Sequence, residues 1–150
     1  MSNRKSRRTV KILLVEDNED DIVIVQEAFS DMTWTTIVGT VRDGEEALQY
    51  LRREGKYESA QLPDAVLLDI NMPKKNGFEV LQDLEREPAL RSLPVIMLTM
   101  SDREEDVIRA YASGARSYIQ KPVDLKLFRI ILKQFEEYWT GVSRLPASLH

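Results

Sequence analysis

The chain has 150 residues, of which 43% are hydrophobic, and it carries 21 basic against 25 acidic side chains, for a net charge of −4. This length suits one domain with one core, and the mild acidity argues against a general nucleic-acid or membrane-surface binder. The sequence has no cysteine and its only histidine is His150, so thiolate chemistry, disulfides and a Ser-His-Asp triad are excluded.

The first eight residues are predicted to form a solvated basic tail. They precede an apolar run that stops at Val15, whereas a secretory signal needs an apolar core of about 7 to 15 residues. A membrane-spanning helix is indicated by about 18 consecutive apolar residues, and no stretch of this sequence approaches that length. We therefore expect a cytoplasmic protein without a membrane or nucleic-acid partner. The expected division is a basic tail at 1–8, one folded domain at 9–140 and a C-terminal tail at 141–150.

Short apolar runs rich in β-branched residues alternate along the chain with longer segments of helical period. The predicted strands are 10–15, 35–40, 65–70, 94–99 and 116–120, and the predicted helices lie near 20–31, 44–54, 77–87, 103–113 and 124–139. This alternation is typical of a parallel sheet covered by helices on both faces. With right-handed crossovers it predicts a single flavodoxin-like (βα)5 α/β domain, doubly wound, with strand order 2-1-3-4-5.

Helix ends can be placed from capping residues. Asp43, Ser101 or Asp102, and Asp124 stand at expected N-cap positions, and Gly114 stands where a helix ends. Asp20 and Asp21 are interpreted as residues that cap the first helix or favour its dipole.

Charged and hydroxyl side chains follow four of the five predicted strands. They are Glu16 and Asp17 after the first strand, Asp69 at the third, Thr99 at the fourth and Lys121 after the fifth. In this fold ligands bind beyond the carboxyl ends of the strands, so these groups should meet at one edge of the sheet. Two carboxylates about 4 Å apart repel by about 4 kcal/mol at an effective dielectric of 20, which favours a bound cation. Oxygen ligands of this kind suit Mg²⁺.

Asp69 is the candidate nucleophile of this site. A carboxylate can take up a phosphoryl group, as in aspartyl-phosphate ATPases. Lys121 and the metal would neutralise the oxygens of that group, and the Thr99 hydroxyl would donate to one of them.

Four segments, "VEDNEDD", "LLDINMPKKNG", "VIMLT" and "YIQKP", resemble the motif blocks of receiver domains in two-component response regulators. The spacing agrees as well, since Thr99 follows Asp69 by 30 positions and Lys121 follows Thr99 by 22. The resemblance covers about residues 9 to 139. It implies a CheY-like domain with Asp69 as phosphoacceptor, phosphorylated by a sensor histidine kinase with Mg²⁺ as cofactor.

The resemblance also assigns roles to further residues. It implies that Mg²⁺ is held by Glu16, Asp17, Asp69 and the backbone carbonyl of Asn71. Thr99 and Tyr118 would form the switch pair, Lys121 would bind the phosphoryl group, and the bond before Pro122 would be cis. Met100 stands where the family commonly has a small residue, so we expect its bulk to narrow access to Asp69.

Only 11 residues follow Trp139. We therefore expect the protein to pass on its signal through a contact. The last helix has a wide apolar stripe, and a homodimer face at Phe128, Phe135 and Trp139 is predicted. The alternative is that this helix is simply buried on the sheet. The "EEYW" ending and the "RLP" at 144–146 resemble stand-alone regulators that partner bacterial phytochromes, which would make such a phytochrome the kinase.

Two other functions share some of these residues. A haloacid-dehalogenase-like phosphatase also uses an Asp nucleophile with Mg²⁺, but it needs an acid two residues after that Asp, where this chain has Asn71. A pseudo-receiver scaffold would lack phosphorylation, yet every reactive residue of the motif is present. We therefore expect a protein that is no enzyme beyond its own phosphorylation and dephosphorylation.

Overall fold

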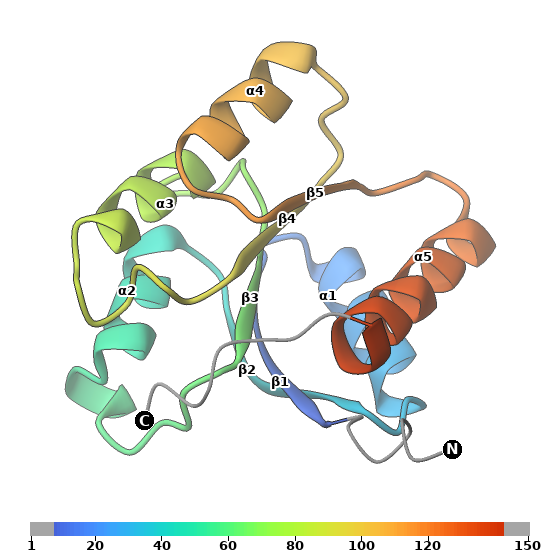
Figure 1. Cartoon of the computed structure of the whole chain (residues 1–150), viewed down its shortest axis with the longest axis horizontal. Helices are drawn as coiled ribbons and strands as arrows, with labels where there is room; N and C mark the ends of the chain where they lie inside the picture. The colour runs from blue at the N-terminus through green and yellow to red at the C-terminus, as the bar shows by residue number, and fades with distance from the viewer. Residues whose placement is uncertain (1–7, 143–150) are drawn as a thin grey trace.

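The computed structural model describes residues 8–142, which form a parallel sheet with helices packed on both of its faces (Figure 1). The strands are β1 Val10–Val15, β2 Thr35–Val41, β3 Ala65–Leu68, β4 Val95–Thr99 and β5 Ser117–Gln120. They are paired in the order β2-β1-β3-β4-β5, every pair parallel. The predicted fold class and strand order are confirmed.

Five α-helices connect or follow these strands: α1 Glu19–Ser30, α2 Gly44–Arg52, α3 Gly77–Glu85, α4 Glu104–Ala112 and α5 Leu125–Glu137. A short 3-10 turn, η2 Gly55–Tyr57, follows α2, and a π-helical turn, η3 Tyr138–Val142, continues α5. Among the described residues, none of the helices is long and apolar enough to cross a membrane.

The sheet separates two apolar clusters because successive side chains of a strand point to opposite faces. Figure 1 shows α1 and α5 on one face, and α2, α3 and α4 on the other. In β3, Val66 and Leu68 pack toward the face that α2 and α3 cover, whereas Ala65 and Leu67 pack toward α1 and α5. All four are buried, which explains why this central strand reads as an unbroken apolar run.

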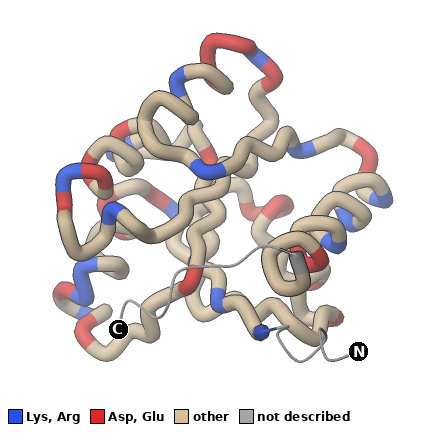
Figure 2. Tube along the Cα trace, viewed as in Figure 1, with Lys and Arg blue, Asp and Glu red and all other residues tan. Residues whose placement is uncertain are grey.

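Three of the four helix ends predicted from Asp43, Ser101 or Asp102, Asp124 and Gly114 are confirmed. Asp43 caps α2 and Asp124 caps α5 through side-chain hydrogen bonds, and Gly114 follows α4 with a φ of 113°. The predicted cap of α4 is wrong, because its N-cap residue is Arg103 and makes no side-chain cap hydrogen bond. Instead, the first turn of α4 holds three acidic residues that suit the positive end of the helix dipole, and Figure 2 shows them gathered at the start of this helix.

Helix α5 buries two of the three residues that were predicted to form a dimer face. Phe128 and Phe135 lie in the apolar cluster shared with α1, only 2% and 4% exposed, and Trp139 packs partly buried against the same cluster. The ring centroids of Phe29 and Phe135 are 5.9 Å apart. For Phe128 and Phe135 the alternative of a helix buried on the sheet therefore holds, because their spacing of about two helical turns places both on the stripe that faces the sheet. A dimer face that includes the partly buried Trp139 stays a prediction.

The outer side of α5 carries different apolar residues. Leu127 and Ile130 are 46% and 54% exposed. The wide apolar stripe of the sequence therefore divides into an inner row, which belongs to the core, and an outer row open to solvent. The tails predicted at 1–8 and 141–150, with "RLP" at 144–146, lie outside the described residues apart from Arg8, Gly141 and Val142.

Two leucines of α5 test this division. Leu132 is 1% exposed, so Leu132→Ala should lower the free energy of unfolding by about 2 to 5 kcal/mol, the usual cost of a cavity in a core. Leu127→Ala, the matched change on the outer side, should cost less than about 1 kcal/mol. Urea unfolding of the two variants measures both values. Equal losses would contradict this orientation of α5.

Candidate functional site

Five side chains meet at the edge of the sheet where the parallel strands end. Glu16 and Asp17 directly follow β1, Asp69 directly follows β3, Thr99 is the last residue of β4, and Lys121 directly follows β5. Four of them are buried, whereas Asp17 is exposed. The structure thus brings together the residues that the sequence placed at this edge.

The carboxylates of Glu16, Asp17 and Asp69 form one cluster, with an oxygen of each lying within 4.8 Å of the others. Burial and the nearby charge of Asp69 raise the pKa of Glu16 from 4.5 to about 7, although Lys121 and the backbone N–H of Asn18 oppose this shift. Such a set of oxygen donors suits a hard divalent cation, because a cation would relieve both the repulsion and the burial of charge.

The ammonium of Lys121 lies inside this acidic cluster. Its Nζ is 2.6 Å from Glu16 Oε1, 2.8 Å from Asp21 Oδ2 and 3.9 Å from Asp69 Oδ2. Burial alone would lower the pKa of Lys121, but Asp69, Asp21 and Glu16 together outweigh it and raise that pKa. The lysine therefore stays charged and partly neutralises the site.

The loop after Asp69 is held at both ends by close backbone packing. The Asp69 carboxylate accepts a hydrogen bond from the N–H of Ile70 at 2.8 Å, and the N–H of Gly77 donates to the carbonyl of Ile70 at 2.8 Å. A Cβ at Gly77 would lie 2.4 Å from the Asp69 carbonyl oxygen, so only glycine fits at the start of α3. The predicted metal ligand Asn71 lies on this loop, two residues beyond Asp69.

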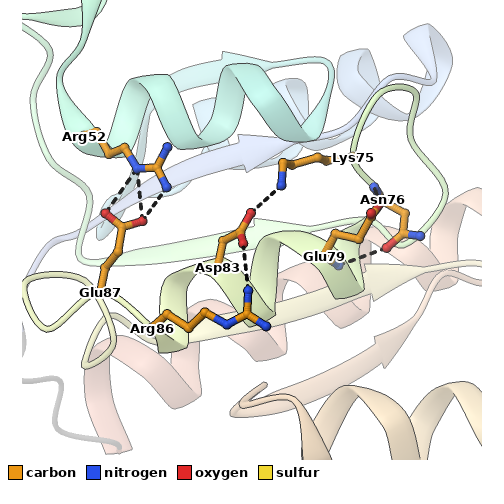
Figure 3. A network of polar contacts seen from close by, with 7 residues as sticks. All are labelled: Arg52, Lys75, Asn76, Glu79, Asp83, Arg86 and Glu87. Atoms are coloured by element: carbon orange, nitrogen blue, oxygen red, sulfur yellow. Dashed lines mark hydrogen bonds and ion pairs between the residues drawn. The ribbon is translucent and has the colours of Figure 1, made fainter.

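Figure 3 shows polar contacts beside this loop, including an ion pair between Arg52 of α2 and Glu87, two residues after the end of α3. Lys75 in the loop contacts Asp83 of α3 at 2.6 Å, and Asn76 forms a capping box with Glu79 at the start of the same helix. The loop that carries Asn71 therefore begins at Asp69 and ends on a capped helix.

The loop after β4 links Thr99 to Tyr118. The Thr99 hydroxyl is buried and accepts a long hydrogen bond, 3.5 Å, from the N–H of Ser101. The Tyr118 hydroxyl donates to the carbonyl of Ser101 at 3.0 Å. Met100 stands between Thr99 and Ser101 and is 60% exposed. The two residues predicted as a switch pair thus contact the same residue of one loop.

One expectation at the site is wrong. None of the peptide bonds within residues 8–142 is cis, so the bond between Lys121 and Pro122 is trans. The trans isomer of such a bond is lower in energy by about 0.5 to 1 kcal/mol. The Lys121 N–H donates to the carbonyl of Thr99 at 2.7 Å, which ties the end of β5 to the end of β4.

The interpretation of Asp21 as a residue that only caps α1 or favours its dipole missed an ion pair. Asn18, not an aspartate, caps α1, and Asp21 is an ion-pair partner of Lys121. Helical spacing could have found this, because Asp21 precedes the buried Val25 and Ala28 by four and seven residues and so lies on the inner stripe of α1.

Known proteins resemble this chain along nearly its whole described length. The family model of the response regulator receiver domain matches residues 12–133. Response regulator Rcp1 of Synechocystis sp. is 39% identical over 138 residues, which cover 91% of this chain and 93% of Rcp1. The probable methanogenesis regulatory protein FilR2 of Methanothrix harundinacea is 40% identical over 136 residues, which cover 90% of this chain and 86% of FilR2.

Solved structures agree with these matches. The phosphorylated cyanobacterial phytochrome response regulator RcpA has a TM-score of 0.87 and 44% identity, covering 93% of this chain and 99% of RcpA. The Mn²⁺-bound form of Rcp1 has a TM-score of 0.85 and 37% identity, covering 92% of this chain and 99% of the Rcp1 chain. The chain therefore belongs to the response regulator receiver domain family, with a CheY-like fold. Within that family it is similar to a phytochrome response regulator.

The raised pKa of Glu16 makes the stability depend on pH. Between pH 4.5 and about 7 the folded protein holds a proton that the unfolded chain has released, so raising the pH through this window should lower the free energy of unfolding by about 3 kcal/mol. Glu16→Gln should remove this loss and be the more stable protein above pH 7. Urea unfolding from pH 5 to 8, with a chelator present, tests both. A loss that persists unchanged in Glu16→Gln would contradict the assignment.

Proposed function

We propose that this receiver takes up a phosphoryl group on Asp69 from a sensor histidine kinase and signals through protein contacts that change with phosphorylation. One observation carries the proposal: the Asp69 carboxylate lies beside both the Lys121 ammonium and the carboxylates of Glu16 and Asp17. A candidate nucleophile, a cation for the transferred group and a ligand set for a metal therefore lie in one cluster of side chains.

The transfer needs no other reactive group from this chain. The Asp69 carboxylate attacks the phosphorus of the donor, and a new oxygen–phosphorus bond forms as the nitrogen–phosphorus bond of the kinase phosphohistidine breaks. The electron pair of that bond stays on the imidazole nitrogen. Water later attacks the phosphorus, which releases inorganic phosphate and restores the carboxylate. The chain then acts on no substrate other than its own phosphoryl group.

The ligand set fits Mg²⁺, since Glu16, Asp17 and Asp69 offer only oxygen donors and the Asn71 carbonyl lies on the adjoining loop. Bound there, Mg²⁺ would neutralise charge that develops on the transferred group. The Mn²⁺-bound form of the relative Rcp1 supports a divalent cation at this kind of site.

Thr99 and Tyr118 would carry the signal outward. A phosphoryl group adds up to two negative charges and three acceptor oxygens to Asp69, and we assign the Thr99 hydroxyl as a donor to one of them. Movement of Thr99 would disturb the Ser101 backbone, whose carbonyl accepts from Tyr118. Phosphorylation would then favour one of two packings of the face made by α4, β5 and α5, including the outer row of α5. A second copy of this chain is one partner that this face could bind.

Intact-protein mass after treatment with acetyl phosphate tests the chemistry. Wild type should gain one phosphoryl adduct that requires Mg²⁺, because the carboxylate cluster otherwise repels the anionic donor. Asp69→Asn should gain none, whereas Asp20→Asn, an exposed acid outside the carboxylate cluster, should behave as wild type. Light scattering on the same samples shows whether the oligomeric state changes. A wild type that takes up no adduct, or one that needs no Mg²⁺, would reject the proposal.

Met100 provides a second arm of the same experiment. If its side chain narrows the way to Asp69, Met100→Ala should raise the rate of adduct formation from acetyl phosphate or the rate of its hydrolysis, by severalfold, without changing the site of modification. Rates equal to those of wild type would remove the gating role.

The kinase is proposed to be a bacterial phytochrome, because the chain is 44% identical to the phytochrome response regulator RcpA over nearly the whole of RcpA. Phosphotransfer from purified, phosphorylated kinases tests this. A bacteriophytochrome kinase should label this protein faster than a histidine kinase that carries no phytochrome module, and Asp69→Asn should stay unlabelled with both. Transfer only from the unrelated kinase would overturn the link.

A further inference from the structure

Asp21 contacts Lys121 but does not belong to the carboxylate cluster that suits a metal. That cluster consists of Glu16, Asp17 and Asp69, whereas Asp21 lies in the first turn of α1. Its carboxylate is 2.8 Å from Nζ, and its side chain is 19% exposed, against 3% for Lys121. A partly buried, charge-assisted hydrogen bond of this length is among the stronger polar contacts in proteins.

Both partners of this contact are fixed by backbone hydrogen bonds. The N–H of Asp21 donates to the side chain of Asn18 at 2.9 Å, which holds the first turn of α1. The N–H of Lys121 donates to the carbonyl of Thr99 at 2.7 Å. The buried Val25, on the same stripe of α1 as Asp21, prevents the helix from rotating. The contact is therefore set by the fold rather than by two flexible side chains that meet by chance.

The Lys121 ammonium lies closer to two of its three carboxylate partners than to the third. Nζ lies 2.6 Å from Glu16 and 2.8 Å from Asp21, but 3.9 Å from Asp69, beyond hydrogen-bond distance. The ammonium has three N–H donors and lies at hydrogen-bond distance from Glu16 and Asp21, so a phosphoryl group on Asp69 would have to share it with these two carboxylates. A cation among Glu16, Asp17 and Asp69 weakens the hold of Glu16, but Asp21 keeps its own.

We propose that Asp21 is a positioning residue that holds Lys121 back from Asp69 and so limits how strongly the ammonium binds a phosphoryl group there. This inference rests on the proposed function of the same site. Asp21 then sets the balance between two partners of Lys121, its own carboxylate and the phosphoryl group. The same contact keeps the ammonium from moving fully onto Glu16 and Asp69, where it would compete with a metal cation.

Two binding measurements on Asp21→Asn test the proposal, and Asp20→Asn is the matched control. The control removes the same charge one residue away, so it measures the effect of charge through space. The first measurement is Mg²⁺ affinity by calorimetry without any phosphoryl group. The second is the affinity for beryllofluoride, an anion that mimics a phosphoryl group on a carboxylate, at saturating Mg²⁺.

Relative to Asp20→Asn, Asp21→Asn should bind Mg²⁺ about threefold more weakly and beryllofluoride about fivefold more tightly, as expected from removing one charge-assisted contact to Lys121. The lifetime of the phosphoryl adduct on Asp69 should change in Asp21→Asn and match wild type in the control. In a Lys121→Met background, checked for folding by thermal unfolding, the difference between the two aspartate variants should disappear.

The outcomes separate this inference from the proposed function. If wild type takes up phosphoryl groups but Asp21→Asn matches Asp20→Asn in both affinities, Asp21 does not position Lys121 and this inference fails alone. A difference that survives in Lys121→Met also overturns it, because the effect would not pass through the lysine. If wild type neither takes up a phosphoryl group nor binds beryllofluoride, both proposals fail.

Discussion

The site depends on one buried ammonium surrounded by carboxylates. Without Lys121, Glu16 and Asp69 would lie together in a poorly solvated pocket, and the cost of two such charges would oppose folding. With Lys121 the charge is reduced but not cancelled, since three carboxylates lie within 4 Å of one Nζ. The remaining negative charge is what makes the cluster suited to a further cation. Burial, together with the nearby charge of Asp69, raises the pKa of Glu16.

The parallel sheet makes this arrangement possible. Each strand delivers its residue to the same edge, and the central strands are buried on both faces, so the ends of β1, β3 and β4 are positioned by packing in two directions. Loops then complete the site, and in the one between Asp69 and Gly77 a single methyl group added at Gly77 would meet the backbone. A rigid core thus positions charged groups that would repel one another on a flexible chain.

Most of the fold and the main site could be predicted from the sequence because both depend on periodicity and on strand ends. The ends of two unbroken apolar runs place Asp69 and Thr99 at the sheet edge without any knowledge of contacts. The errors arose where one sequence pattern fits more than one set of contacts. The stripe on α5 contains both an inner and an outer row, so spacing alone did not show that Phe135 faces the core. Likewise Asp20 and Asp21 are equivalent as acids near a helix start, and only the position of Lys121 separates them.

The contacts around Thr99 would carry the proposed phosphorylation signal from Asp69 toward the surface. Thr99 and Lys121 are joined by a backbone hydrogen bond, and Thr99 and Tyr118 both contact Ser101, so the ends of β4 and β5 and the loop before α4 form one connected unit. Ser101 also donates through its hydroxyl to Asp106 in the first turn of α4, at 2.6 Å. Helix α4 has no side-chain cap of its own, so this bond is part of what fixes its start. If Thr99 moves and its hydrogen bond with Ser101 breaks, the change therefore acts on the start of α4, where this helix has no side-chain cap.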